Sequence, residues 1–384
     1  MIDFSLSDEE RAVRDTIRRF VDRELRPLEE TVLRNERSGL PSLEPGVLTA
    51  LQQKARAAGY WGPATPEEYG GMDLGAVMHA IVEMELGRTF VPFEFGGGAD
   101  NVLFACTPEQ KETYLLPTIA GERRSCFALT EPGAGSDARN IRTSARRDGG
   151  DWVVNGEKTF ITDGSEADFC ILFARTGEGV TAFLVDREMG WKSSPIALMG
   201  DWPAASLSFE EVRVPGENVL GEVGGGLDLA LSWIGQKRYL IPARAVGASE
   251  RLLGMALEHA RVRESMGRPI ADYQAIQWQI ADSQVEIESA KWLTLYAAWR
   301  AQQGLDARHA TAVAKLHGSV IANQVVDRVL QIHGGMGYTR ELPVERWYRN
   351  LRVMRIFEGT DEIQRRTIAR NLLKGHVALG TIGE

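Results

Sequence analysis

The sequence predicts an α+β protein with three domains. Apolar residues recur at helical spacing in the first third of the chain, which predicts an N-terminal helical domain over residues 1–120. Short β-rich runs separated by glycine and proline follow, and they predict a middle antiparallel β-domain, a barrel or a sandwich, over residues 121–229. Long helical patterns with apolar stripes then predict a C-terminal α-helical bundle over residues 230–384.

The N-terminal domain is expected to open with a capped helix. Ser7 precedes the first periodic apolar residues and Glu10 follows three positions later, which is the pattern of a capping box. Pro27 is expected to end this helix, because proline lacks the backbone N–H that the helix needs. Further helices are predicted over residues 47–58, 76–86 and 109–120, with a loop rich in proline and glycine over residues 63–74.

The middle domain is expected to contain a hairpin and several short strands. Asn155-Gly156 is a dipeptide preferred in two-residue hairpin turns, so a turn is predicted there. Strands are predicted over residues 169–173, 181–185 and 207–214.

The C-terminal region carries three helical patterns that exceed the usual length of helices in soluble domains. They cover residues 239–263, 274–303 and 307–331. Alanine and other small residues are frequent in them, which permits close packing between helices or between subunits. A last helix is predicted over residues 361–373.

The composition argues against several classes of protein. A formal net charge of −9 is unusual for a general nucleic-acid binder. Cys106, Cys126 and Cys170 are odd in number and widely spaced, which favours buried free thiols over disulfides or zinc ligands. The histidines show no paired spacing, so no metal is expected. The acidic N-terminus and the lack of a long apolar run predict no membrane span and a cytoplasmic location.

Glu358 is the strongest candidate for a catalytic residue. It follows the apolar pair Ile356 and Phe357 and precedes Gly359, which makes it a poor candidate for a solvated surface charge. A carboxylate in such surroundings suits the removal of a proton from carbon, because desolvation makes it a stronger base. A lone glutamate is nevertheless most often a solvated side chain, so the interpretation depends on the other segments of the chain.

Three further segments carry residue types that bind cofactors. Residues 127–137, FALTEPGAGSD, offer hydroxyls and backbone N–H groups to a flat ring or an anion, although an ordinary β-turn is the more common meaning of a short glycine motif. Phe160 offers an aromatic face, or it is a core residue of a strand. Arg263 and Arg268 suit a phosphate, or they belong to a basic loop between helices.

Six motifs follow one another along the chain: ALTEPGAGSD, GEKTFITDG, RxxxGRPI, QIHGGMGY, PVERWYR and FEGTDEIQR. In this order and at this spacing they resemble the flavin-dependent acyl-CoA dehydrogenases over essentially the whole length. The resemblance implies an N-terminal helical domain, a middle β-domain and a C-terminal four-helix bundle, assembled as a homotetramer or a dimer. It also implies FAD as the cofactor, extended between the β-domain and the bundle.

The resemblance assigns roles to individual positions. The residues implied to contact FAD are Phe127, Leu129, Thr130, Gly135, Ser136, Phe160, Thr162, Arg263, Tyr273, Gln274, Gln331, Gly334, Gly335, Thr360 and Glu362. The residues implied to contact an acyl-CoA substrate are Ser136, Arg238 and Gly359. Residues 331–335 are implied to reach the cofactor of a neighbouring subunit, and Glu358 matches the family's catalytic base.

The implied reaction is the α,β-dehydrogenation of an acyl-CoA thioester to a trans-2-enoyl-CoA. Glu358 is expected to abstract the α-proton and flavin N5 to take the β-hydride, with the electrons passed to an electron-transfer flavoprotein. Phe160 stands where the family usually has tryptophan, which implies a smaller stacking surface. Lys237 stands where one branch of the family carries its base, so that branch is disfavoured.

Two alternatives stay open from the sequence. An acyl-CoA oxidase of the same fold uses the same acid and passes electrons to oxygen. A non-catalytic acyl-CoA-binding homologue needs neither flavin nor Glu358. Related flavin monooxygenases usually lack this glutamate, which counts against them. The acyl group itself is not specified, because Gly96, Gly97 and Gly98 predict either a roomy acyl site or a flexible helix break.

Overall fold

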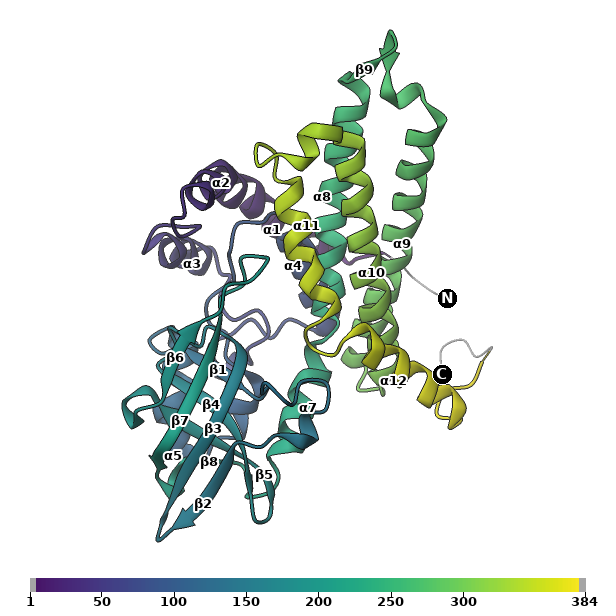
Figure 1. Ribbon diagram of the computed structural model, residues 1–384. Helices are drawn as coiled ribbons and strands as arrows, with labels where there is room; N and C mark the ends of the chain where they lie inside the picture. The colour runs from purple at the N-terminus through teal and green to yellow at the C-terminus, as the bar shows by residue number, and fades with distance from the viewer. Residues whose placement is uncertain (1–4, 380–384) are drawn as a thin grey trace. The chain divides into compact units, whose positions relative to one another are not determined.

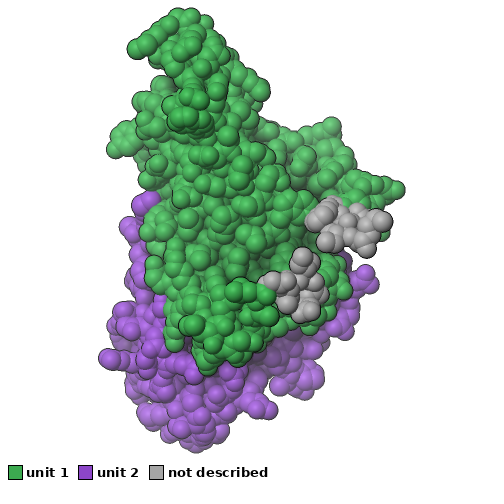
Figure 2. Space-filling model, turned by 90° about the vertical axis from the view of Figure 1, so that its right-hand side faces the viewer, with its two compact units in different colours: residues 1–59, 74–94, 238–384 green, residues 60–73, 95–237 purple. Residues whose placement is uncertain are grey.

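The computed structural model describes residues 5–379, except for the side chains of Ser232, Trp233, Ile234, Gln236 and Lys237. Figure 1 shows the helices and the sheet along the chain, and Figure 2 colours two compact units. Unit 1 comprises residues 1–59, 74–94 and 238–384, and unit 2 comprises residues 60–73 and 95–237. The predicted fold class is confirmed, with helices before and after a sheet of eight strands. The predicted domain limits at residues 120 and 229 stay predictions, and the side chain of Lys237 lies outside the described residues.

Unit 1 begins with the predicted capped helix, α1 (Asp8–Phe20). The backbone N–H of Glu10 donates to Ser7 Oγ at 3.1 Å and that of Ser7 donates to the Glu10 carboxylate at 2.8 Å. The expectation that Pro27 ends the helical run was wrong. The chain continues through a π-helical turn (Val21–Leu25) and a 3₁₀ turn (Arg26–Leu28) into α2 (Glu29–Arg37). Pro27 lies in the first turn of the 3₁₀ segment, where a missing N–H removes no hydrogen bond.

The remaining helices of unit 1 form the bundle and the helices packed on it. They are α3 (Val47–Ala57), α4 (Ala76–Gly87), α8 (Leu240–Val262), α9 (Gln274–Gln302), α10 (Arg308–His333), α11 (Val344–Leu351) and α12 (Asp361–Leu373). Figure 1 shows α8, α9 and α10 side by side. Within residues 5–379, no helix combines the length and the hydropathy needed to cross a bilayer.

Helix α4 packs unusually close to α8 because both contribute glycines at the crossing. A Cβ on Gly247 would lie 1.9 Å from the carbonyl oxygen of Met84, and a Cβ on Gly87 would lie 2.3 Å from that of Arg244. No other residue fits at this separation. The N-terminal helix α4 is therefore part of the same compact unit as the bundle.

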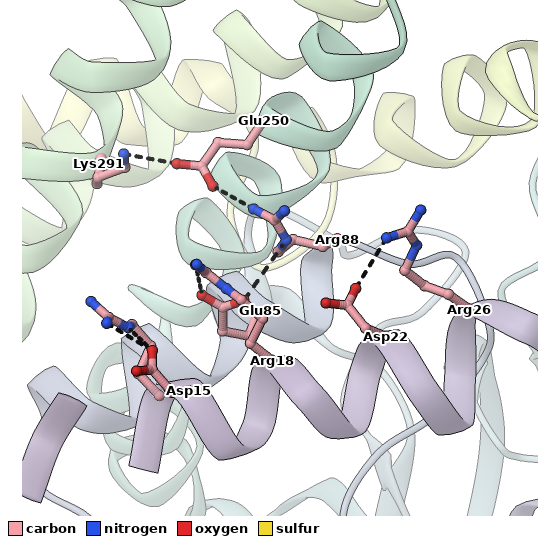
Figure 3. A network of polar contacts seen from close by, with 9 residues as sticks. Asp15, Arg18, Asp22, Arg26, Glu85, Arg88, Glu250 and Lys291 are labelled. Carbon is pink, nitrogen blue, oxygen red and sulfur yellow. Dashed lines mark hydrogen bonds and ion pairs between the residues drawn. The ribbon is translucent and has the colours of Figure 1, made fainter. Parts of the chain in front are cut away.

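A chain of ion pairs joins four helices of unit 1 (Figure 3). The guanidinium of Arg18 on α1 lies 2.6 Å from the carboxylate of Glu85 on α4, whose side chain is buried. Arg88, directly after α4, lies 3.8 Å from Glu85 and 3.3 Å from Glu250 on α8. Lys291 on α9 lies 2.7 Å from Glu250. These contacts connect α1, α4, α8 and α9 into one framework.

Unit 2 is built on a sheet whose strands run in the order β6-β7-β3-β2-β4-β5-β8, with β1 beside β4. The strands are β1 (Ser125–Ala128), β2 (Ser144–Asp148), β3 (Asp151–Thr162), β4 (Phe169–Thr176), β5 (Gly179–Asp186), β6 (Lys192–Pro195), β7 (Ala204–Val214) and β8 (Val219–Leu220). Most pairs are antiparallel, but β4 pairs in parallel with β1 and β2. Successive residues of β4 belong alternately to two buried hydrophobic clusters, so both faces of the sheet are covered.

Helical segments of unit 2 flank the sheet. They are α5 (Pro108–Gln110), a π-helical turn (Lys111–Leu115), α6 (Leu116–Ala120) and α7 (Gly226–Lys237). Leu103, Leu115 and Ile119 join the cluster on one face of the sheet. The predicted helix over residues 109–120 is therefore confirmed as a helical segment, with a π-turn in its middle.

The hairpin turn predicted at Asn155-Gly156 was wrong. Both residues lie inside β3, and the turn between β2 and β3 is at residues 149–150. Gly156 is needed for another reason, because a Cβ there would lie 2.6 Å from Thr143 Cα on the neighbouring segment. Asn155 Oδ1 accepts a hydrogen bond of 2.9 Å from the N–H of Glu211, at a bulge between β3 and β7.

The glycine run at residues 96–98 serves packing inside unit 2. A Cβ on Gly96 would lie 2.2 Å from the indole of Trp61, and a Cβ on Gly97 would lie 2.5 Å from the same ring. The carbonyl of Gly97 also accepts a hydrogen bond of 2.6 Å from Thr65 Oγ1. The space left by Gly96 and Gly97 is thus filled by Trp61.

Candidate active site

Glu358 lies in a tight turn of unit 1 between a 3₁₀ turn (Arg352–Arg355) and α12. Its φ is +48° and that of Gly359 is +92°, so two successive residues adopt the left-handed conformation. A glutamate rarely adopts it, because its Cβ approaches the backbone too closely. Thr360 then caps α12, with its Oγ1 accepting a hydrogen bond of 3.3 Å from the N–H of Ile363. Strained, non-glycine positions of this kind are concentrated at functional sites.

The carbonyl of Gly359 is held by two side chains. Lys315 Nζ on α10 donates to it at 2.7 Å and Gln364 Nε2 on α12 donates at 2.9 Å. Both side chains are completely buried. Next to this turn, the buried carboxylate of Asp361 lies 2.7 Å from Arg355 Nε. The conformation of Glu358 is therefore fixed from α10 and α12.

Arg238 lies two residues before α8 and interacts electrostatically with Glu358. Burial lowers the pKa of the Arg238 guanidinium, and the negative charge of Glu358 opposes that shift. Arg238 Nε is buried and has no hydrogen-bond partner among the described residues. A buried donor without a partner is costly, and a polar group of a ligand would satisfy it.

In unit 2, Phe160 presents an aromatic ring to solvent from β3. Its side chain is 61 % exposed and its φ is +56°. It occupies a bulge in which three steps along β3, from Lys158 to Ile161, face two steps along β7. The bulge turns an aromatic ring out of a sheet whose other aromatic side chains are mostly buried in its two cores. The exposure of Phe160 excludes the interpretation as a core residue of a strand. The interpretation as an aromatic face for a ligand is left.

The turn that begins at Leu129 is attached to β3 directly before Phe160. Lys158 Nζ donates to the Leu129 carbonyl at 3.0 Å and to the Glu131 carboxylate at 2.8 Å. The N–H of Thr159 donates to the carbonyl of Thr130 at 2.9 Å. Ser136, Gly135 and Thr162 are exposed, Leu129 is buried, and Phe127 packs on Phe173 with ring centroids 4.8 Å apart.

The phosphate-binding candidates lie at the end of the bundle where α8 and α10 finish. Arg263 follows α8, and a hairpin of β9 (Glu264–Ser265) and β10 (Arg268–Pro269) leads to Tyr273 and to Gln274, the first residue of α9. Tyr273 Oη donates to the Ser265 carbonyl at 2.8 Å, and Arg268 lies over the Tyr273 ring at 4.2 Å.

The glycine pair predicted to reach a neighbouring subunit is at the same end of the bundle. Gln331, Gly334 and Gly335 are exposed at the end of α10. His333 stacks on His259 of α8 with ring centroids 4.4 Å apart, which places the two helix ends together. Lys315, which marks the Glu358 turn, is 18 residues earlier on α10, about 27 Å along the helix axis. The structure therefore brings Glu358, Gly359, Thr360 and Arg238 together. Glu362 is exposed on the adjoining first turn of α12. The hairpin of β9 and β10, with Arg263 and Arg268, lies at the other end of the bundle.

Several residues of the site were missed by sequence reasoning. Lys315 and Gln364 hold the Gly359 carbonyl, and Lys158 and Glu131 fix the turn beside Phe160. For Lys315, the sequence did contain a signal that could have identified it: this lysine is surrounded by small and apolar residues in the segment 312–316, AVAKL. Such a lysine is rarely buried without a specific partner.

The side chains of unit 2 fit an isoalloxazine ring. An exposed aromatic face at Phe160 can stack on a flat heterocycle, and the hydroxyls of Thr130, Ser136 and Thr162 are the donors and acceptors that ring nitrogens and oxygens need. The exposed guanidinium groups of Arg263 and Arg268 in unit 1 suit a pyrophosphate.

Comparison with protein families matches three domains of one family. They are the acyl-CoA dehydrogenase N-terminal domain over residues 7–122, the middle domain over residues 126–212 and the C-terminal domain over residues 224–373. Among curated proteins, the chain is 35% identical to (R)-benzylsuccinyl-CoA dehydrogenase of Thauera aromatica, with 97% of each chain covered.

Solved structures agree with the family match. Butyryl-CoA dehydrogenase from Megasphaera elsdenii has a TM-score of 0.85 and 30% identity over 97% of this chain and 100% of that one. A chain in a structure of the electron transferring flavoprotein of Acidaminococcus fermentans has a TM-score of 0.86 and 32% identity, with 97% and 100% covered. The FAD complex of PigA has a TM-score of 0.84 and 28% identity, with 97% and 99% covered.

The fold and the family matches define a flavoprotein oxidoreductase. The chain belongs to the acyl-CoA dehydrogenase family, whose members depend on FAD. The expected recognition of the family and the expectation of an enzyme are both confirmed.

Proposed function

We propose that this enzyme removes two hydrogens from an acyl-CoA thioester to give a trans-2-enoyl-CoA, with Glu358 as the base. The observation that carries the proposal is the turn at Glu358. A carboxylate is held there in a left-handed conformation, and it interacts with the half-buried cation Arg238, whose buried Nε has no hydrogen-bond partner among the described residues. A strained acid next to an unused buried donor is costly for stability and is explained by a ligand.

The proposed chemistry requires a positioned base. The α-C–H of a thioester is a weak acid, and a carboxylate removes its proton only when it is held at the reacting carbon and the developing negative charge is stabilised. The contacts of Lys315 and Gln364 with the Gly359 carbonyl restrict the movement of the Glu358 turn. Gly359 has no Cβ that would obstruct a thioester beside the base.

FAD, when bound, supplies the acceptor for the β-hydrogen and its electron pair. In this proposal the ring is held by Phe160 with Thr130, Ser136 and Thr162, and Phe127, Leu129 and Gly135 support that turn. The remaining cofactor contacts are Arg263, Tyr273, Gln274, Gln331, Gly334, Gly335, Thr360 and Glu362. The substrate contacts are Ser136, Arg238 and Gly359.

The proposal extends to partners and location. The electrons are passed to an electron-transfer flavoprotein, and the chain assembles as a homodimer or homotetramer. Exposed aromatic residues on α9 favour such an assembly. A cytoplasmic location is favoured by three cysteines that are all free and buried.

The test is anaerobic bleaching of the bound flavin by a panel of acyl-CoAs of different length and branching. We expect wild type to bleach with at least one of them, and Glu358→Gln to retain FAD but lose bleaching. Glu178→Gln is a matched control, because Glu178 also precedes a glycine of positive φ, Gly179, but lies in the exposed hairpin between β4 and β5. Equal bleaching by wild type and Glu358→Gln would exclude Glu358 as the base.

Two further readouts separate the alternatives. Rapid peroxide formation in air without an added electron acceptor identifies an oxidase. Absence of flavin absorbance from the purified protein identifies a non-catalytic homologue.

A further inference from the structure

Lys315 is a buried lysine whose ammonium group contacts the catalytic turn. It lies in the first third of α10, and its side chain has no exposed surface. Its Nζ donates to the carbonyl of Gly359 at 2.7 Å, so it reaches the residue directly after Glu358. Gln364 Nε2 donates to the same oxygen, so this one carbonyl receives two buried donors.

The surroundings of Lys315 do not neutralise it through an ion pair. Asp361 on α12 is the acid with the largest effect on it, but the Asp361 carboxylate lies 2.7 Å from Arg355 Nε. Glu358 and Glu362 also interact with Lys315, and Arg238 repels it. Within the described chain, Lys315 makes no salt bridge. Burying an ammonium group without one is costly, and a polar but neutral residue would cost less at a position with a purely structural role.

We propose that Lys315 is a positioning residue for the proton abstraction, which fixes the Glu358 turn through the Gly359 carbonyl and supplies a positive charge that favours the carboxylate form of Glu358. This inference rests on the proposed function of Glu358 and adds a second residue to it. The hydrogen bond and the charge are separate contributions, and they are separable by substitution. A charge-assisted hydrogen bond to a carbonyl is stronger than a neutral one.

The protonation state of Lys315 sets the range in which this effect operates. Burial lowers the pKa of Lys315 to about 8, Asp361, Glu358 and Glu362 oppose that shift, and Arg238 adds to it. The ammonium group is therefore present at neutral pH and is lost as the pH rises above about 8. Throughout the acidic range Lys315 carries its charge.

The test compares Lys315→Met and Lys315→Gln by anaerobic stopped-flow measurement of flavin bleaching across the acidic pH range. Methionine removes the charge and the donor, whereas glutamine removes the charge and keeps a donor. In both variants we expect the acidic limb of the rate profile to move to higher pH by about one pH unit, because a nearby cation no longer favours the carboxylate. In Lys315→Met the maximal rate is expected to fall roughly 10- to 100-fold, because the turn is no longer held. Lys315→Gln should lose less of that rate.

Lys291→Met is the control for the loss of a lysine from the same bundle. Lys291 forms ion pairs with Glu250 and Glu288, away from the Glu358 turn, so its loss should lower the melting temperature and leave the rate profile unchanged. If Lys315→Met does not fold, the test uses Lys315→Gln alone and compares the pH of the acidic limb of its rate profile with that of wild type.

The outcomes are distinct from those that test the proposed function. An acidic limb that stays at its wild-type position in both Lys315 variants overturns the inference, provided that bleaching depends on Glu358. If Glu358→Gln bleaches as wild type does, the proposed function is wrong and the role of Lys315 is wrong with it.

Discussion

The Nζ atom of Lys158 lies 2.8 Å from a carboxylate oxygen of Glu131, and both side chains are buried inside unit 2. Lys158 also donates to the Leu129 carbonyl, and the Glu131 carboxylate also accepts hydrogen bonds from the backbone N–H groups of Arg142 and Thr143. Burial lowers the pKa of Lys158 to about 8, and Glu131 opposes that shift. The pair fastens the turn after β1 to β3, one residue before the bulge that exposes Phe160.

The first prediction concerns this ion pair. Lys158→Met leaves the Glu131 carboxylate buried without its cation, and such a loss typically lowers the free energy of unfolding by about 3–5 kcal/mol. FAD affinity should fall as well, because the turn at Thr130 is no longer attached to β3. Urea unfolding and a fluorescence titration with FAD measure the two effects.

The double variant Lys158→Met with Glu131→Gln is the control for this prediction. It removes both charges and keeps an acceptor for the two backbone N–H groups, so it should be more stable than the single variant. A single variant as stable as the double one would show that the buried charge has no energetic consequence.

The second prediction concerns Phe160, whose exposed ring and φ of +56° suggest that it is retained for binding and not for stability. Phe160→Gly relieves the left-handed strain, worth about 1–2 kcal/mol, but adds backbone freedom to the unfolded chain, worth about 0.5–1 kcal/mol. The FAD-free protein should therefore be as stable as wild type or slightly more stable. FAD affinity should fall about 10-fold, because the stacking surface is removed.

Asp73→Gly is the matched control, since Asp73 has a φ of +46° in the same unit and no aromatic ring. It should give a similar change in stability and no change in FAD affinity. If Phe160→Gly destabilises the FAD-free protein strongly, the ring has a structural role after all.

Much of the fold was predictable because its signals are local. The capping box at Ser7 and Glu10 involves residues three positions apart, and the long helices repeat one periodicity. The prediction of a turn at Asn155-Gly156, inside β3, was wrong. Glycine is required at position 156 because Thr143, which belongs to another segment, lies too close to leave room for a Cβ. A local pattern contains no information about such a neighbour.

The candidate site also contains features that are visible in the sequence and features that only the folded chain shows. Glu358 and Gly359 are adjacent, so their unusual combination is visible in the sequence. The roles of Lys315 and Lys158 depend on partners 44 and 27 positions away. Only the folded chain shows that these lysines are buried against the two turns.

The third prediction concerns the conformation of the turn at Glu358 and Gly359. Gly359→Ala places a Cβ at a φ of +92° and 2.5 Å from Gln364 Nε2, so it introduces backbone strain and displaces one of the two donors to the Gly359 carbonyl. We expect a loss of about 1–3 kcal/mol in the free energy of unfolding, as is typical for strained positions. The rate of flavin bleaching should fall because Glu358 is displaced.

Gly375→Ala separates strain from displacement. Gly375 has a φ of +68° after α12, but a Cβ there meets nothing within 4 Å. The variant should lose stability through strain and bleach flavin at the wild-type rate. Equal bleaching rates for the two alanine variants would contradict the role given to the Gln364 contact.

The fourth prediction concerns self-association. Trp278, Val285, Trp292 and Trp299 recur every seven residues along α9, and their side chains are exposed, with Trp278 at 60 % and Val285 at 69 %. A stripe with this period lies along one face of a helix, and an apolar stripe exposed to water on a long helix is typical of a packing surface between subunits. Tyr296 widens the same stripe, because it precedes Trp299 by three residues.

We therefore expect Trp278→Asp with Trp292→Asp to lower the molar mass measured by light scattering after size-exclusion chromatography, to that of a smaller assembly or of the monomer. Each substitution places a charge on the apolar stripe, and its desolvation in a subunit interface is costly. Leu40→Asp is the control, because Leu40 is also an exposed apolar residue, at 57 %, but belongs to a loop after α2 and not to α9. If the wild type is an oligomer and the double tryptophan variant has the same mass, the subunit interface lies elsewhere. If the double variant has a lower mass and Leu40→Asp has the wild-type mass, the interface is assigned to α9.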